Sequence, residues 1–223
     1  LLDPEVTVGL PPQLTATTGM DAMTHAGEAY IGGSTTRGTR QAAVEAVRLI
    51  LESLPVAYAS GGDRTARAHM LRAAYLAGTA FTKSYVGYVH AVAHSLGGQY
   101  GIAHGLANAV LLPEVLEAYG PAAPKRLGRL AVEVGVAGVN ATPAQASAKF
   151  IAKLRKMNAD MGIPRTLEGI REEDLPALAR HADHEGNPLY PVPVLMDANE
   201  LQALYRLVMP KTEENTNDAA ADR

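Results

Sequence analysis

The sequence predicts an all-α protein, and three observations support this prediction. Apolar residues recur at helical spacing from about residue 15 onward. The segment "PEVTVGLPP" (residues 4–12) is typical of the end of a strand and a linker, and after it runs of alternating β-branched residues are nearly missing. Glycines, prolines and capping residues separate the helical segments. We therefore expect a multi-helix bundle over residues 15–209, with a linker before it (residues 1–14) and a polar tail after it (residues 210–223).

The first part of the bundle is predicted to hold three helices. The first runs from about Thr18 to Ile31, where the glycines and capping residues of "GGSTTRG" stop it. The second helix covers about residues 38–53, and its apolar stripe, which must face a core, contains Val44, Val47, Leu51 and Leu54. The third helix covers residues 64–81, and Asp63 is its expected N-cap. This helix is rich in small residues and should be buried on several sides.

The second part of the bundle begins with a segment that contains three of the seven histidines. A helix over residues 106–120 follows that segment, and we expect Pro113 to interrupt it because proline lacks a backbone N–H. Thr142 and Pro143 form a cap and first-turn pair for a helix that reaches about Met161. Two more helices are predicted from apolar spacing, over residues 171–182 and 197–209.

The composition limits the possible partners. The 223 residues include 47% hydrophobic residues, and 20 basic and 23 acidic side chains give a formal charge of −3, so we expect neither nucleic acid nor a membrane surface as a partner. Cysteine is absent, so any metal must use nitrogen and oxygen ligands, and a cytoplasmic location fits. No apolar run approaches the ~20 residues of a membrane span. Because the sequence lacks an initiator methionine, we expect a piece of a longer protein.

Five side chains have a spacing that suits a metal site. Asp21 and His25 stand four residues apart on the first predicted helix, so both lie on one face. His90 and His94 repeat this spacing on a later helix, and His104 follows a glycine-rich break, "GGQYG", that can return it beside them. Four of these five could surround one ion and leave room for water or a substrate oxygen. Imidazole and carboxylate are ligands that Fe²⁺, Zn²⁺ or Mn²⁺ accept.

The same spacing also fits a plainer interpretation. An aspartate and a histidine four residues apart commonly form a hydrogen-bonded pair without a metal, so spacing alone leaves both interpretations open. The other three histidines, His69, His181 and His184, are dispersed in polar sequence and are expected to be solvated.

Three segments carry a resemblance to a known family. "GLPPQLTATTGMDAMTHAGEAY" (residues 9–30), "GYVHAVAHSLGGQYGIAHGLANAVLLP" (residues 87–113) and "MGIPRTL" (residues 161–167) resemble segments of the iron-containing (group III) alcohol dehydrogenases, in the same order and at similar separations. The resemblance covers most of the chain to about Met209 and corresponds to the C-terminal, metal-binding helical domain of that family. It implies a fold of the dehydroquinate synthase type.

The resemblance also implies roles for individual residues. The family's metal ligands fall on Asp21, His25, His90 and His104. The histidine that the family places close to the nicotinamide, and that is implicated in proton transfer, falls on His94. Phe81 matches an aromatic residue at the nicotinamide and substrate end of the cleft, although plain core packing explains it equally well.

Some positions depart from the family pattern. Ser95 and Ala103 stand where proline is usual, which changes backbone stiffness but removes no ligand. Gly27 replaces a bulky apolar residue. No glycine-rich pyrophosphate-binding turn of the "GGGSxxD" kind occurs, because "GGS" at 32–34 and "SGGDR" at 60–64 do not follow a strand. We therefore expect NAD or NADP to be bound mainly by an N-terminal α/β domain that is absent here and is supplied in cis or in trans.

The resemblance thus implies a metal-dependent oxidoreductase that interconverts an alcohol and an aldehyde or ketone with NAD(P)(H). This chain would be its metal and substrate domain, with Fe²⁺ as the expected ion, Zn²⁺ or Mn²⁺ as alternatives, and a homo-oligomer as the expected assembly. Two other functions remain open from the residues alone. One is a stand-alone divalent-metal hydrolase or lyase, since a site with an open position could activate water. The other is a non-catalytic helical domain that a metal stabilises.

Overall fold

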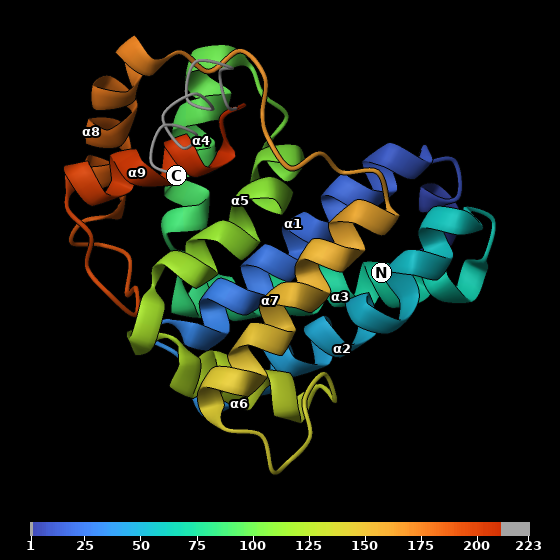
Figure 1. Ribbon diagram of the computed structural model, residues 1–223. Coiled ribbons are helices and arrows are strands. Elements are labelled where there is room, and N and C mark those ends of the chain that lie inside the picture. The colour runs from blue at the N-terminus through green and yellow to red at the C-terminus, as the bar shows by residue number, and fades with distance from the viewer. Residues whose placement is uncertain (1, 211–223) are drawn as a thin grey trace, which may run out of the picture.

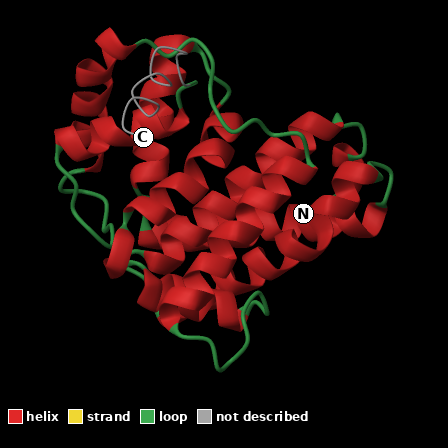
Figure 2. Ribbon diagram, in the orientation of Figure 1, coloured by secondary structure: helices red, strands yellow, loops and turns green. Residues whose placement is uncertain are grey.

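The computed structural model describes residues 2–210, and within that range it contains helices and loops but no strand (Figure 2). The α-helices of this range are α1 (Pro12–Ile31), α2 (Arg37–Ala59), α3 (Arg64–Ser84), α4 (Tyr88–Tyr100), α5 (His104–Ala118), α6 (Pro124–Glu133), α7 (Pro143–Asp160), α8 (Leu175–Gly186) and α9 (Ala198–Val208). The short 3₁₀ turns are η1 (Pro4–Thr7), η2 (Gly120–Ala122) and η3 (Glu172–Asp174). The all-α prediction is confirmed. None of the described helices combines the length and the apolar character needed to cross a membrane.

Helix α1 lies at the centre of the bundle. It contacts α2, α3, α5 and α6, and most of its residues are buried. Helices α4, α8 and α9 pack on one another at one end of the molecule, away from α2 and α3 (Figure 1). Helix α5 joins the two groups because it contacts α1 on one side and α4, α7 and α9 on others. Polar residues on α1, α4 and α5 can therefore meet where these three helices converge.

The close approach of α5 to α1 depends on a glycine. A Cβ added at Gly105, in the first turn of α5, would lie 2.8 Å from the carbonyl oxygen of Thr17 on α1. Real Cβ atoms do not come so close to backbone, so any larger residue must push the two helices apart. Because His104 precedes Gly105 directly, the glycine also determines how near His104 lies to α1.

The expected end of a strand at residues 4–12 is wrong. Pro4–Thr7 form a 3₁₀ turn, and α1 begins at Pro12 rather than at Thr18. Proline is well suited to the first turn of a helix because its missing N–H would have no partner there.

The segment before α1 is anchored by a buried arginine. Arg67 of α3 is only 2% exposed, and its guanidinium donates hydrogen bonds to the Leu10 carbonyl (3.2 Å) and to Oγ1 of Thr15 (2.8 Å). It also donates to the carbonyl of Gly61, at 2.8 Å. Three acceptors around one buried guanidinium tie the start of α1 to α3.

The prediction that Pro113 interrupts its helix is also wrong. Helix α5 continues through Pro113 to Ala118. Proline leaves the carbonyl four residues earlier, that of Ala109, without its usual donor. Asn158 of α7 supplies the replacement, because its side-chain amide donates to the Ala109 carbonyl at 2.6 Å.

The predicted helix caps agree well with the structure. Asp63 accepts the N–H of Ala66 at the start of α3, and Thr142 forms a capping box with Gln145 at the start of α7. Helix α2 runs beyond the predicted end, through Pro55 to Ala59, and buries Ala57 in the core.

Helix α6 was not predicted, although its buried Leu127, Leu130 and Ala131 have helical spacing. Helix α6 has only ten residues, and it follows a short turn that contains Gly120 and Pro121. The apolar pattern of such a short helix is hard to recognise in the sequence. The polar tail predicted for residues 210–223 lies, apart from Pro210, outside the described residues.

Replacing Gly105 with alanine tests the close approach of α1 and α5. We expect Gly105→Ala to lower the free energy of unfolding by about 1–3 kcal/mol, because the added methyl group overlaps the Thr17 carbonyl. The matched control is Gly78→Ala in the middle of α3, where a Cβ would meet nothing within 4 Å. That control should raise stability by about 0.5–1 kcal/mol. Urea unfolding of both variants measures the difference, and equal stabilisation by the two alanines would contradict the packing argument.

Candidate metal centre

Three of the expected ligands converge where α1, α4 and α5 meet. One potential ligand atom each from Asp21, His90 and His104 can be chosen so that all three atoms lie within 4.8 Å of one another. Oδ1 of Asp21 lies 3.8 Å from Nε2 of His90 and 3.3 Å from Nε2 of His104. His90 is buried, Asp21 is partly exposed, and the His104 side chain is 43% exposed, so the cluster opens toward solvent on one side. A small molecule can therefore reach it.

The chain reversal that brings His104 back is shorter than the sequence suggested. Gly97 and Gly98 belong to α4, and only Gly101 leaves the helix, with a φ of 66° in the left-handed region that favours glycine. Helix α5 then starts at His104 itself. The expectation that this break returns His104 to the neighbourhood of His90 is confirmed, but one glycine makes the turn.

A buried carboxylate fixes the orientation of His90. Glu28 of α1 is 3% exposed, and its Oε2 lies 2.6 Å from Nδ1 of His90. Its Oε1 accepts the backbone N–H of Val89 at 2.8 Å, in the first turn of α4. When the Glu28 carboxylate accepts a hydrogen bond from Nδ1, the lone pair of a neutral His90 ring lies on Nε2.

The other ring nitrogen of His90 has the character of a metal ligand. Nε2 is buried and has no hydrogen-bond partner among the described residues. Buried polar atoms are nearly always paired, and an orphaned one suggests a missing ion or water. A carboxylate that holds one imidazole nitrogen while the other faces an ion is a common arrangement around protein metals. The residues of this cluster therefore fit a divalent ion.

Asn108 links two members of the cluster. It lies one turn after His104 on α5 and is completely buried. Its amide nitrogen donates to Oδ1 of Asp21 at 2.6 Å and lies 3.0 Å from Nε2 of His104. Asn108 thus holds the aspartate and the exposed histidine side by side.

His25 and Phe81 lie at the edge of the cluster. Nδ1 of His25 is 3.8 Å from Oδ2 of Asp21, and the rings of His25 and His90 have centroids 4.3 Å apart. His25 is not part of the group of three, and its ring stacks on Phe81 at a centroid distance of 4.3 Å. Phe81, near the end of α3, therefore packs against an expected ligand rather than against the hydrophobic core alone.

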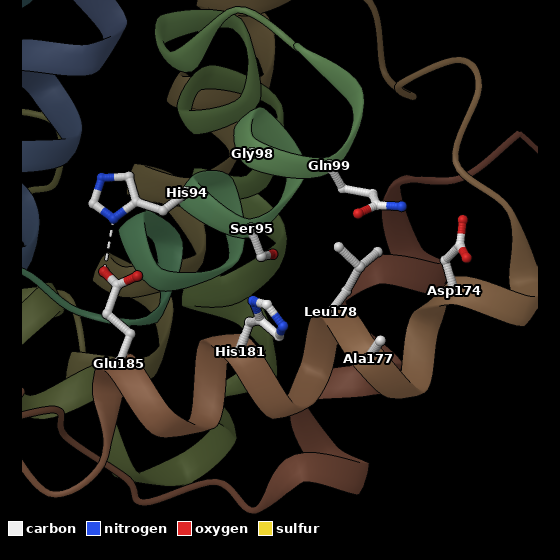
Figure 3. A pocket seen from close by; sticks show the side chains of 9 residues that line it. All are labelled: His94, Ser95, Gly98, Gln99, Asp174, Ala177, Leu178, His181 and Glu185. Atoms are coloured by element: carbon white, nitrogen blue, oxygen red, sulfur yellow. Dashed lines mark hydrogen bonds and ion pairs between the residues drawn. The ribbon is translucent and has the colours of Figure 1, made fainter.

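His94 has different partners from the other imidazoles. Its Nδ1 lies 2.7 Å from Oε1 of Glu185 on α8, and its ring stacks on that of His104 at 5.1 Å. Figure 3 shows His94 and Glu185 at one end of a pocket between α4 and α8, with Asp174 at the other end. The pocket volume is about 360 Å³.

The surroundings of the histidines shift their pKa values in different directions. Burial, with a smaller contribution from His90, lowers the pKa of His25 to about 4. Burial also lowers the pKa of His104. In contrast, the hydrogen bond with Glu185 raises the pKa of His94. At neutral pH, His25 and His104 are therefore neutral and able to donate a lone pair, whereas His94 holds a proton more strongly.

The remaining histidines do not join the cluster. His181 and His184 are exposed, as predicted, although His181 lines the pocket beside His94. His69 differs from the prediction because it is half-buried and its Nδ1 lies 2.9 Å from Oγ of Ser53.

One departure from the family pattern, Ser95, has a local explanation. Oγ of Ser95 donates to the Val92 carbonyl at 2.8 Å and lies 2.6 Å from the hydroxyl of Tyr205 on α9. A serine here therefore ties α4 to α9. Ala103 directly precedes α5, and Gly27 is buried with no atom within 4 Å of an added Cβ.

Sequence reasoning missed Glu28, Asn108 and Glu185. Glu28 follows His25 by three residues and Asn108 follows His104 by four, so helical spacing could have suggested both. Glu185 gave no such signal, because it lies 91 residues from His94 in the sequence.

Comparisons with known proteins identify similar chains. A family model described as "Fe-containing alcohol dehydrogenase family, C-terminal" matches residues 15–209. Alcohol dehydrogenase 4 of Saccharomyces cerevisiae is 46% identical over 187 residues, which make up 82% of this chain and 47% of the yeast protein. The crystal structure of a 1,3-propanediol oxidoreductase superposes with a TM-score of 0.88 at 41% identity, and the match covers 93% of this chain and 55% of that one.

A second similar structure is the sulfoacetaldehyde reductase of Bifidobacterium kashiwanohense in complex with NAD⁺. Its TM-score is 0.83 at 26% identity, over 94% of this chain and 54% of that one. The chain thus spans about half the length of the relatives that it matches.

Removing the Glu28 carboxylate tests its structural role. Glu28→Ala leaves the N–H of Val89 and Nδ1–H of His90 unpaired in a buried place. We expect the free energy of unfolding to fall by about 2–5 kcal/mol, measured by urea unfolding in the presence of a chelator. The control Glu52→Ala removes an exposed carboxylate from α2 and should change stability by less than about 0.5 kcal/mol. Similar stability of both variants would show that Glu28 does not hold α4.

Proposed function

The chain belongs to the Fe-containing alcohol dehydrogenase family, and on this premise we propose that it forms the metal- and substrate-binding part of an NAD(P)-dependent enzyme that interconverts an alcohol and an aldehyde or ketone. The observation that carries the proposal is the convergence of Asp21, His90 and His104 around the buried, unpartnered Nε2 of His90. Buried polar atoms are nearly always paired, so the unpaired Nε2 among three potential ligands supports the proposal.

The ligands that we propose for the ion are one carboxylate and three neutral imidazoles. They are Asp21, His25, His90 and His104. His25 is the fourth member, since it contacts both Asp21 and His90 without joining the tight group. Oxygen and imidazole nitrogen suit Fe²⁺, Zn²⁺ and Mn²⁺. Family membership favours Fe²⁺, while affinity order alone favours zinc.

The chemistry requires two groups besides the protein. When bound, the ion supplies Lewis acidity toward an alcohol or carbonyl oxygen, and a nicotinamide supplies the acceptor or donor of the hydride. The protein's own part is to orient the reacting oxygen and to move its proton. We assign the transfer of this proton to His94. Its ring stacks on that of His104, and its side chain is exposed enough to exchange a proton with solvent. Phe81 would provide an apolar wall for the substrate or nicotinamide next to His25.

The nucleotide is proposed to bind mainly to a second domain. The described residues contain no strand followed by a glycine-rich turn, which is the usual site for a pyrophosphate. The matched relatives are about twice as long as this chain, which supports an N-terminal nucleotide-binding domain in cis or in trans.

Metal content tests the ligand assignment. In the full-length protein, His90→Ala or His104→Ala should abolish stoichiometric metal, because each removes one of the converging nitrogen atoms. His184→Ala, which removes an exposed histidine of α8, is the matched control and should keep the full metal content. Elemental analysis of protein purified without oxygen provides the measurement. Undiminished metal in both cluster variants would refute the site.

Activity tests the reaction. We expect the full-length protein loaded with metal to reduce NAD or NADP in the presence of short diols or primary alcohols, followed by absorbance of the reduced nicotinamide. His94→Gln should keep its metal and lose about 10²–10⁴-fold in kcat, the usual contribution of a proton-transferring group. A metal-loaded protein that hydrolyses esters or amides but oxidises no alcohol would favour the hydrolase instead. Loss of metal in His94→Gln would make His94 a ligand.

A further inference from the structure

A carboxylate on α8 holds His94 through one ring nitrogen. Oε1 of Glu185 lies 2.7 Å from Nδ1 of His94 (Figure 3), and the hydroxyl of Tyr190 donates to the same oxygen at 2.7 Å. One carboxylate oxygen thus receives two hydrogen bonds. Burial on its own raises the pKa of Glu185, but the hydrogen bonds from His94 and Tyr190 outweigh it and lower the pKa. Glu185 is therefore ionised at neutral pH.

The backbone of α8 is placed so that Glu185 can reach His94. Gly186 follows Glu185 directly, and a Cβ there would lie 3.0 Å from the ring of Tyr88, in the first turn of α4. The hydroxyl of Tyr88 in turn donates to Oδ1 of Asn187 at 2.7 Å and accepts the N–H of Met196 at 3.0 Å. These contacts fix the end of α8 against the helix that carries His94.

This contact determines which ring nitrogen of His94 is free. An ionised carboxylate cannot donate, so Nδ1 of His94 carries the proton in the contact with Glu185. The other ring nitrogen, Nε2, points away from Glu185 (Figure 3). In the tautomer that Glu185 enforces, Nε2 is the only nitrogen of the neutral ring with a lone pair.

We propose that Glu185, supported by Tyr190, is a positioning residue that fixes the orientation and the tautomer of His94, so that Nε2 is the atom that exchanges the substrate proton. The inference rests on the proposed function, because it gives a partner to the proposed proton carrier. It differs from a surface ion pair that only joins α4 to α8, since such a pair would influence stability without influencing turnover. The arrangement repeats the pairing of Glu28 with His90, but on a histidine that is 43% exposed.

The kinetic test compares three variants of the full-length, metal-loaded enzyme. Glu185→Ala should lower kcat by about 10–100-fold while metal content and the KM for the alcohol stay unchanged. Glu185→Gln should retain more turnover, because its amide oxygen still accepts the Nδ1 proton. The control Glu173→Gln, on an exposed glutamate whose nearest cation, Arg171, is 3.6 Å away, should behave as wild type. A kcat for Glu185→Ala within twofold of wild type would overturn the proposal.

A second readout does not depend on activity. Nitrogen-15 NMR of the histidine side chains in the metal-free, full-length protein reports which ring nitrogen is protonated, at a pH where the ring is neutral. Wild type should show His94 protonated at Nδ1, and Glu185→Ala should lose this preference. An unchanged tautomer would overturn the inference even if turnover fell. If the wild-type protein oxidises no alcohol, the proposed function fails, whereas the tautomer still decides the role of Glu185.

Discussion

The buried carboxylate of Glu28 is the contact on which the arrangement of the cluster depends. It accepts the N–H of Val89 at the start of α4, where the helix dipole favours a negative charge, and it orients the ring of His90. Space for this carboxylate exists only because position 87 is glycine, since a Cβ there would lie 2.7 Å from Oε1 of Glu28. One side chain of α1 therefore determines where α4 begins and which nitrogen of its first histidine faces the cluster.

The four imidazoles near the cluster are chemically distinct because different elements surround them. His90 is enclosed by α1 and α4, His25 is sandwiched between Phe81 and His90, and His104 stands at the open side of the cluster. His94 stacks on His104 and also contacts a carboxylate of α8. In the function that we propose, the same side chain serves as ligand or as proton carrier according to burial and hydrogen bonding, with no difference in covalent chemistry.

Much of the fold could be predicted from the sequence because it depends on local signals. The caps Asp63 and Thr142 and the apolar stripes mark helices with little help from the rest of the chain. The gathering of His90 and His104 was also predictable, since a single turn separates their helices. Two of the wrong or missing predictions involve partners that are distant in sequence. The continuation of α5 past Pro113 requires Asn158, and the contact of His94 with Glu185 joins residues 91 positions apart.

The hydrogen bond from Asn158 to the Ala109 carbonyl has a consequence for how such sequences can diverge. Proline at position 113 is tolerated inside α5 because a donor from α7 replaces the one that it removes. A lineage that loses Asn158 first would leave a buried carbonyl unpaired, whereas a lineage that exchanges Pro113 first would make the asparagine dispensable. The two positions are therefore coupled, and the order of substitution determines which evolutionary path stays open.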